Sequence, residues 1–314
     1  MSTSSPASQR FRLDANDLGL LGVVLIWGFN LPAVKIALGQ FEPLSFNAVR
    51  FVLASSLLLL LLHRRESSRM SRRDMLFLFG LGLLGQTAYQ ILFIEGISRT
   101  TASHTALIFG LTPVLVALLS LLLGHEKVGV WGWTGALLAF GGEYLIIAGK
   151  SPAEGPTPSL RGDLLVLGAA FCWCLYTVLA RPLLSRHSPL KVTALSVAWG
   201  TLAMLPLCFP SIRRQEWKLV SPANWMIAVL SSLFALVVAY LLWYRSVHRV
   251  GNVRTAVYSN LVPVTGTFAG WLILGERLYP LLAVGAAAIF AGIVLTRRRE
   301  ADAGEATELP DIEG

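Results

Sequence analysis

Residues 105–114, TALIFGLTPV, recur 150 positions later as residues 255–264, TAVYSNLVPV. The same offset relates residues 99–142 to residues 249–292, with 12 identities in these 44 positions. The identical pairs join Arg99, Thr105, Ala106, Leu111, Pro113, Val114, Leu122, Glu126, Gly135, Ala136, Phe140 and Gly142 to Arg249, Thr255, Ala256, Leu261, Pro263, Val264, Leu272, Glu276, Gly285, Ala286, Phe290 and Gly292. The chain is therefore expected to consist of two related halves.

Earlier in the chain the same repeat continues at an offset of 146. Asp17, Gly22, Trp27 and Pro43-Leu44 match Asp163, Gly168, Trp173 and Pro189-Leu190. The matches include Trp, Arg, Glu and Pro at a common register, which a shared Leu, Gly and Ala content alone does not explain.

The composition places both halves in a membrane. Hydrophobic residues make up 54% of the chain and charged residues 14%, with a mean hydropathy of +0.63. A soluble domain carries about 25% charged residues, so this chain has too few to cover a water-exposed surface. The net charge of +8 is attributed to cytoplasmic loops and not to nucleic-acid binding. The lipid bilayer is the expected environment.

A transmembrane helix needs about 20 apolar residues. Ten runs of that kind occur, at about 18–38, 44–63, 74–97, 102–123, 130–149, 163–184, 190–209, 224–246, 254–274 and 280–297. We expect a first five-helix repeat at 18–149, an extracytoplasmic linker at 150–162, a second repeat at 163–297, and disordered cytoplasmic tails at 1–17 and 298–314.

The positive charges give the expected orientation. With the N-terminus inside, 17 of the 26 Lys and Arg residues fall on the inner side and eight on the outer side, and Arg50 lies within a span. Cytoplasmic loops collect Lys and Arg, so both termini are expected in the cytoplasm and the chain in the cytoplasmic (inner) membrane.

A repeat with an odd number of crossings enters the membrane upside down relative to the first. The predicted fold class is an all-α membrane protein with ten transmembrane helices in two inverted five-helix repeats. Inverted repeats are typical of alternating-access transporters, whose site lies between the repeats near the midplane.

Several motifs carry a resemblance to a known family. They are Trp27-Gly28-Phe29-Asn30, Lys35, Glu42-Pro43, Arg50, the segment 107–113 before Glu126, and Gly135 with Gly142, and in the second half Trp173, Pro189, Pro263, Gly275-Glu276, Gly285 and Gly292. Residues 18–297 resemble the EamA-type pattern of the drug/metabolite transporter superfamily. That resemblance implies ten helices in two inverted units and movement of small metabolites, often export of amino acids or drugs. The second half departs from the pattern, with Ser196 in place of Arg50.

Polar and aromatic side chains share helix faces in several spans, at i, i+3, i+4 spacing. The candidate substrate-binding residues are Trp27, Asn30, Gln86, Tyr89, Gln90, Phe93, Trp173, Tyr176, Trp199, Tyr240, Tyr258, Ser259 and Arg50. A largely apolar lining with a few hydrogen-bonding groups suits an amphipathic solute such as an aromatic or apolar amino acid. The competing interpretation is helix packing and interfacial aromatic belts.

Other candidates concern the transport cycle. Arg50 within a span is a candidate carboxylate ligand, although pairing with backbone carbonyls is the alternative. Pro113 and Pro263 occupy matching positions and are proposed as hinges. Glu143 is the candidate for proton coupling, and facilitated diffusion remains open.

Function classes other than transport find little support. The five histidines show no metal-ligand spacing, so no metal and no cofactor is expected, and a membrane enzyme is an unfavoured alternative. The expected partner is a small-molecule substrate, and the expected state is a monomer. A multidrug or cationic-compound exporter is the alternative within the transporter class.

Overall fold

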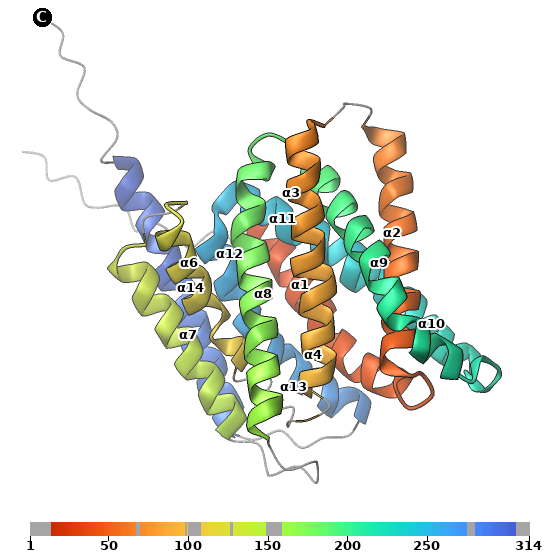
Figure 1. The fold of residues 1–314 in the computed structure, drawn as a ribbon. Coiled ribbons are helices and arrows are strands. Elements are labelled where there is room, and N and C mark those ends of the chain that lie inside the picture. Colours follow the sequence, from red (N-terminus) through yellow and green to blue (C-terminus); the bar gives the residue numbers. More distant parts are fainter. Residues whose placement is uncertain are drawn as a thin grey trace, which may run out of the picture.

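The computed structural model describes residues 14–66, 70–97, 99, 108–125, 128–148, 159–274 and 280–305. All regular elements in these ranges are helices (Figure 1). Six of the helices described there are long and apolar enough to cross a membrane, and shorter apolar helices cover 108–122 and 280–296. The six long helices correspond to expected spans, and the total of ten stays a prediction.

The first half begins with α1 (Ala15–Ala37) and α2 (Pro43–Arg65). One long span follows, made of α3 (Arg72–Gly82), η1 (Leu83–Ala88) and α4 (Tyr89–Ile97). The half ends with α6 (Thr112–Leu122) and α7 (Val130–Ala148). Asp14 caps α1 in a capping box with Asp17, which satisfies backbone N–H groups at the helix start.

The second half repeats this order. It comprises α8 (Leu160–Leu184), α9 (Pro189–Arg214), the short η2 (Trp217–Leu219), α10 (Pro222–Ser231), η3 (Ser232–Val238), α11 (Ala239–Val250), α12 (Asn252–Val257), η4 (Tyr258–Leu261), α13 (Val262–Leu274) and α14 (Pro280–Glu305). Serine side chains cap α8, α9 and α10, and proline occupies the first turn of α9 and α10. Proline there lacks only an N–H that has no partner in the helix.

Each half contains a π-helical segment at the corresponding place. In η1 the N–H of Tyr89 bonds the carbonyl of Leu84, and in η3 the N–H of Ala239 bonds the carbonyl of Phe234. The two pairs differ by the repeat offset of 150. Segments of this kind add a residue to a turn and are frequent at functional sites.

Corresponding helices of the two halves pack antiparallel. Built Cβ atoms on Gly135 and Gly292 would each meet the other residue's carbonyl oxygen, and Gly142 and Gly285 form a second such pair, so α7 and α14 run in opposite directions. The pairing is reciprocal, because Gly285 corresponds to Gly135 and Gly292 to Gly142. Figure 1 places these helices at one side of the bundle and α2 with α9 at the other.

The α2–α9 pair has the same arrangement. Ser45 at the start of α2 bonds Ser211 near the end of α9, at 3.1 Å between the hydroxyl oxygens. Farther along, the Thr201 hydroxyl lies 3.4 Å from the Phe51 carbonyl oxygen. Two antiparallel pairs of corresponding helices are the arrangement that a two-fold axis perpendicular to the helices produces.

Some helices begin or end a few residues away from the expected boundaries. The tail expected at 1–17 is helical from Ala15, and Asp17 is fully buried and bound to Arg254 and Tyr258. The linker expected at 150–162 ends earlier, because α8 begins at Leu160. The C-terminal tail expected from 298 includes the end of α14, which extends to Glu305. Residues 1–13, 149–158 and 306–314 lie outside the described ranges.

Candidate functional site

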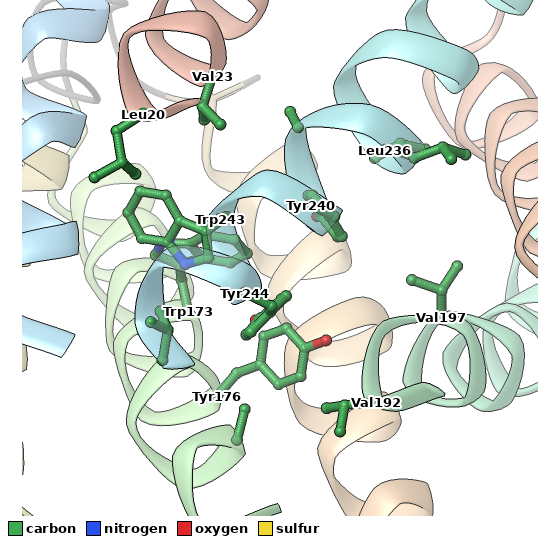
Figure 2. Close-up of a cluster of buried hydrophobic side chains, with 14 of the residues drawn as sticks. Leu20, Val23, Trp173, Tyr176, Val192, Val197, Leu236, Tyr240, Trp243 and Tyr244 are labelled. Atoms are coloured by element: carbon green, nitrogen blue, oxygen red, sulfur yellow. The ribbon is translucent and has the colours of Figure 1, made fainter. Parts of the chain in front are cut away.

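An aromatic cluster lies where the halves meet. It consists of Trp27 on α1, Tyr89 on α4, Trp173 and Tyr176 on α8, and Tyr240, Trp243 and Tyr244 on α11. Trp27 and Trp173 are corresponding residues, and their ring centroids lie 5.9 Å apart. Trp243 touches both, at 5.3 and 5.8 Å. Figure 2 shows Trp173 and Tyr176 of α8 together with Tyr240, Trp243 and Tyr244 of α11.

The cluster is also central along the helices. Trp27 is residue 13 of the 23 in α1, and Trp173 is residue 14 of the 25 in α8. Contact between two corresponding residues requires both to lie beside the axis that relates the halves. The aromatic cluster therefore occupies the centre of the bundle.

Arg50 adjoins the aromatic cluster. Its side chain is more than nine-tenths buried, and its guanidinium lies close enough to Tyr89 and Tyr240 to interact with them electrostatically. Nη1 lies 3.4 Å from the Asn47 side-chain oxygen, and the guanidinium stands over the Phe46 ring, 5.2 Å from its centroid. The Asn47 amide nitrogen donates in turn to the Gln90 side-chain oxygen at 3.2 Å.

Other candidates on the predicted faces connect the two halves. The Trp27 indole N–H donates to the Ala235 carbonyl in η3 at 3.1 Å, and Asn30 accepts a bond from the Ser231 hydroxyl at 2.5 Å. Gln86 is fully buried in η1 and lies against Gly200 of α9. The structure thus brings Trp27, Tyr89, Gln90, Trp173, Tyr176, Tyr240 and Arg50 together, with Asn30 and Gln86 at the edges of this group.

Three sequence candidates have their described polar contacts elsewhere, and a fourth, Phe93, lies at the edge of the aromatic cluster. The Trp199 indole packs on Phe79 and donates to the Met75 sulfur at 3.4 Å, on the outer side of α3. The Tyr258 hydroxyl donates to Asp17 at 2.7 Å. Ser259 of η4 donates to the Ala256 carbonyl of α12, and Phe93 packs on both Tyr89 and Phe109.

The hinge and coupling candidates lie outside the aromatic cluster. Pro113 and Pro263 each stand at the second residue of a helix, directly after a turn at Leu111 and after η4. Glu143 is buried on α7, and its carboxylate lies against Gly110. Its Oε2 atom has no hydrogen-bond partner in the part of the chain that the structure describes.

The sequence reasoning missed Asn47 and Phe46 as members of the site. Asn47 links Arg50 to Gln90, and the Arg50 guanidinium packs against the face of the Phe46 ring. Phe46 and Asn47 stand four and three residues before Arg50, the spacing at which helical side chains meet. That spacing was a usable signal, because a buried cation requires neighbours that stabilise it.

Polar contacts tie the halves together at the end of the bundle where α2 ends and α3 begins. Lys191 lies 3.4 Å from Glu66, and Asp74 lies 3.0 Å from Arg186 and 2.9 Å from His187. These contacts join the loop regions of α2–α3 and α8–α9. At the start of α1, Arg254 contacts Asp17 at 3.1 Å and Asp14 at 3.2 Å.

At the opposite end of the bundle, neutral amides join the loop between α1 and α2 to the segment between α9 and α10. The Gln215 side chain accepts from the Glu42 N–H at 2.6 Å and donates to the Gln40 carbonyl at 3.0 Å. The Gln40 side chain accepts from Asn224 at 2.7 Å. Phe41, Phe46, Trp217 and Trp225 pack beside them. The two halves are therefore in polar contact at both ends of the bundle, and the aromatic cluster lies between these ends.

Two apolar hollows lie away from the aromatic cluster. One, of about 220 Å³, lies between α2 and η3 and is lined by residues such as Leu53 and Leu233. The other, of about 470 Å³, lies along α9 beside Leu202 and Phe209. The residues that line these two hollows do not include the cluster rings, which pack against one another.

Comparisons with known proteins agree with this architecture. The chain is 27% identical to the uncharacterized transporter YyaM of Bacillus subtilis, over 88% of this chain and 91% of that one. It is 25% identical to a protein of Streptantibioticus cattleyicolor named a probable terminal-alkyne amino-acid exporter, over 89% and 92%. A solved crystal structure shares the fold at a TM-score of 0.74 and 20% identity, over 91% of this chain and 97% of that one.

The family comparison covers both halves. The model of the EamA-like transporter family matches residues 15–148 and again residues 160–298. These two ranges coincide with the halves that the internal repeat defines. The chain is a multi-pass membrane protein, and it belongs to the EamA-like transporter family.

Proposed function

We propose that the protein is a secondary transporter that exports small metabolites, with amino acids as the first substrates, by alternating access. It has ten spans in two inverted five-helix repeats, works as a monomer without a cofactor, and has both termini in the cytoplasm. The distribution of Lys and Arg supports this orientation, with the α2–α3 end on the cytoplasmic side.

The contact between Trp27 and Trp173 carries the proposal. These corresponding residues meet at mid-length of their helices, beside the axis between the halves. A substrate site at a repeat interface near the membrane midplane is the arrangement on which alternating access depends. We place the site at the aromatic cluster with Arg50, Asn47 and Gln90.

The polar contacts at both ends fit a closed intermediate of such a cycle. Ion pairs hold the halves together at the cytoplasmic end, and amide hydrogen bonds do so at the outer end. Release of one set at a time would open the centre to one side. Pro113 and Pro263, at the junctions described above, are the proposed bending points, and Glu143 is the proposed coupling group.

The site chemistry favours an amphipathic, carboxylate-bearing solute over a cationic drug. Seven aromatic side chains offer apolar and π surface, and Asn47 and Gln90 offer amides. The buried Arg50 repels a cation. The name of the Streptantibioticus relative, an amino-acid exporter, adds support for this substrate class.

Efflux from proteoliposomes tests the proposal. Vesicles loaded with labelled phenylalanine, leucine or threonine should lose label faster with the protein than without it, and phenylalanine should leave fastest. A cationic dye serves as the second cargo. Protein-dependent efflux of the dye with none of the amino acids would replace this proposal with a drug exporter, whereas no flux of any cargo would contradict transport of these classes.

A further inference from the structure

Arg50 is a buried cation without an acidic partner in the residues that the structure describes. No carboxylate in these ranges forms an ion pair with it. Its Nε atom has no hydrogen-bond partner there, and the shortest described polar contact of the guanidinium is the 3.4 Å approach to Asn47. A charged side chain deep in a membrane is costly and usually marks a functional site.

The neighbours of Arg50 position it without neutralising it. The Asn47 oxygen faces the guanidinium, while the Asn47 amide nitrogen donates to Gln90. Phe46 supports the guanidinium from one side through a cation–π contact at 5.2 Å. A planar guanidinium held in place by an amide and a ring still carries unused donors, which match a carboxylate in a bidentate geometry.

The position of Arg50 beside the rings defines the rest of the ligand. Tyr89 and Tyr240 both interact with Arg50, and both pack on Trp173, at 5.5 and 5.9 Å between ring centroids. A ligand whose carboxylate meets Arg50 would therefore place its remaining atoms among aromatic faces. This arrangement suits an aromatic or apolar side chain on a small carboxylate.

The two halves differ at this position. Ser196 corresponds to Arg50 and bonds the Tyr176 hydroxyl at 2.7 Å. Among the described residues of the site, Arg50 is the one charged group. One guanidinium matches one carboxylate, whereas a phosphate monoester usually requires several cationic side chains.

We propose that Arg50, held by Asn47 and Phe46, is the carboxylate-binding subsite of the transporter and selects monocarboxylates with an aromatic or apolar group. This inference rests on the proposed function. It makes a separate claim, because a transporter of aromatic amines or neutral solutes would use the same aromatic cluster without Arg50.

The test compares a carboxylate with its decarboxylated analogue. Efflux of labelled phenylalanine and of labelled phenethylamine is measured for the wild type, R50Q, R50K and R213Q. Arg213 is the matched control, because it also stands over a ring, that of Phe209 at 5.9 Å, but at the end of α9. R50Q should reduce phenylalanine efflux about tenfold to 100-fold, the range for losing a charged hydrogen bond, and should not reduce phenethylamine efflux. R50K should retain part of the preference, and R213Q should match the wild type.

An equal loss of both fluxes in R50Q, or an unchanged ratio of the two, would overturn the subsite. A binding measurement in detergent covers the case of a variant that does not fold. Phenylalanine and 3-phenylpropionate should raise the melting temperature of the wild type more than phenylalanine methyl ester and phenethylamine do. Equal stabilisation by acid and ester, or none by either acid, contradicts the inference. Absence of flux alone, with acid-specific stabilisation retained, would contradict transport and leave the subsite supported.

Discussion

The two ionisable candidate residues, Arg50 and Glu143, differ in their surroundings. Arg50 lies beside the aromatic cluster and has neighbours that orient it. Glu143 lies on α7 against the backbone of Gly110, and its described contacts do not reach the cluster. Under the proposed function, Arg50 would hold the solute and Glu143 would link its movement to a proton.

Replacing Glu143 with Gln tests the coupling role. An amide has the size of the carboxyl group, and Oε2 has no described hydrogen bond to lose, so E143Q should retain the melting temperature of the wild type. Efflux of phenylalanine driven by an imposed pH gradient should fall to the rate seen without a gradient. The control is E95Q, because Glu95 is partly exposed and pairs with Arg99 on its own helix. Gradient-driven efflux in E143Q equal to that of the wild type would remove Glu143 from the mechanism.

At the scale of helices, the crossing of α7 and α14 depends on glycines that bring two backbones into contact. Small residues allow this close approach in membranes, where packing and not the hydrophobic effect holds helices together. A methyl group added at Gly142 would lie 2.6 Å from the Gly285 carbonyl oxygen. The adjacent Gly141 has open space around the same position.

Alanine at these two glycines should therefore have opposite effects. G142A should lower the free energy of unfolding by about 1–3 kcal/mol through overpacking. G141A should raise it by about 0.4–1 kcal/mol, because alanine restricts the unfolded chain and meets nothing in the fold. Thermal unfolding in detergent measures both. Similar melting temperatures for the two variants would mean that the helices do not cross as described.

Contacts between the two halves belong to the scale of the whole molecule. The Glu66–Lys191 pair joins a loop of one half to a helix of the other, and the Lys191 side chain is 6% exposed. A partly buried pair of this kind stabilises the contact between the halves at the end that we propose to be cytoplasmic. Its loss should favour the conformation open to that side.

Accessibility from the cytoplasm measures that shift. In a background with serine at the three native cysteines, Q86C reports on the interior of the bundle, because Gln86 is fully buried against α9. E66Q should speed labelling by a maleimide applied at the cytoplasmic face about fivefold, since a pair of this type contributes about 1 kcal/mol. The charge-reversed pair E66K/K191E should restore slow labelling, and E95Q should not change it. Faster labelling from the outer face instead would reverse the assignment of the two ends.

Much of this architecture could be predicted from the chain. The repeat offset relates the two halves, and helical spacing indicated the faces on which Trp27, Trp173 and Tyr240 meet. The π-helical segments could not be predicted, because an added residue in a turn is stabilised by packing between helices and has no local sequence signal. The same holds for the 3-10 segment η4, whose tighter turns direct the Tyr258 side chain toward Asp17. The mid-span position of Trp199 does not show which way its side chain points, and in the structure the indole packs on α3.

The glycine crossing has a mechanical consequence. Two helix backbones that touch at two points lose most of their attraction if they slide or separate slightly. We therefore expect α7 and α14 to keep their position relative to each other. Rotation of one half about the α7–α14 pair moves nearby helices little and distant helices most. The α2–α9 edge, at the other side of the bundle, is where such a rotation produces its widest gap (Figure 1).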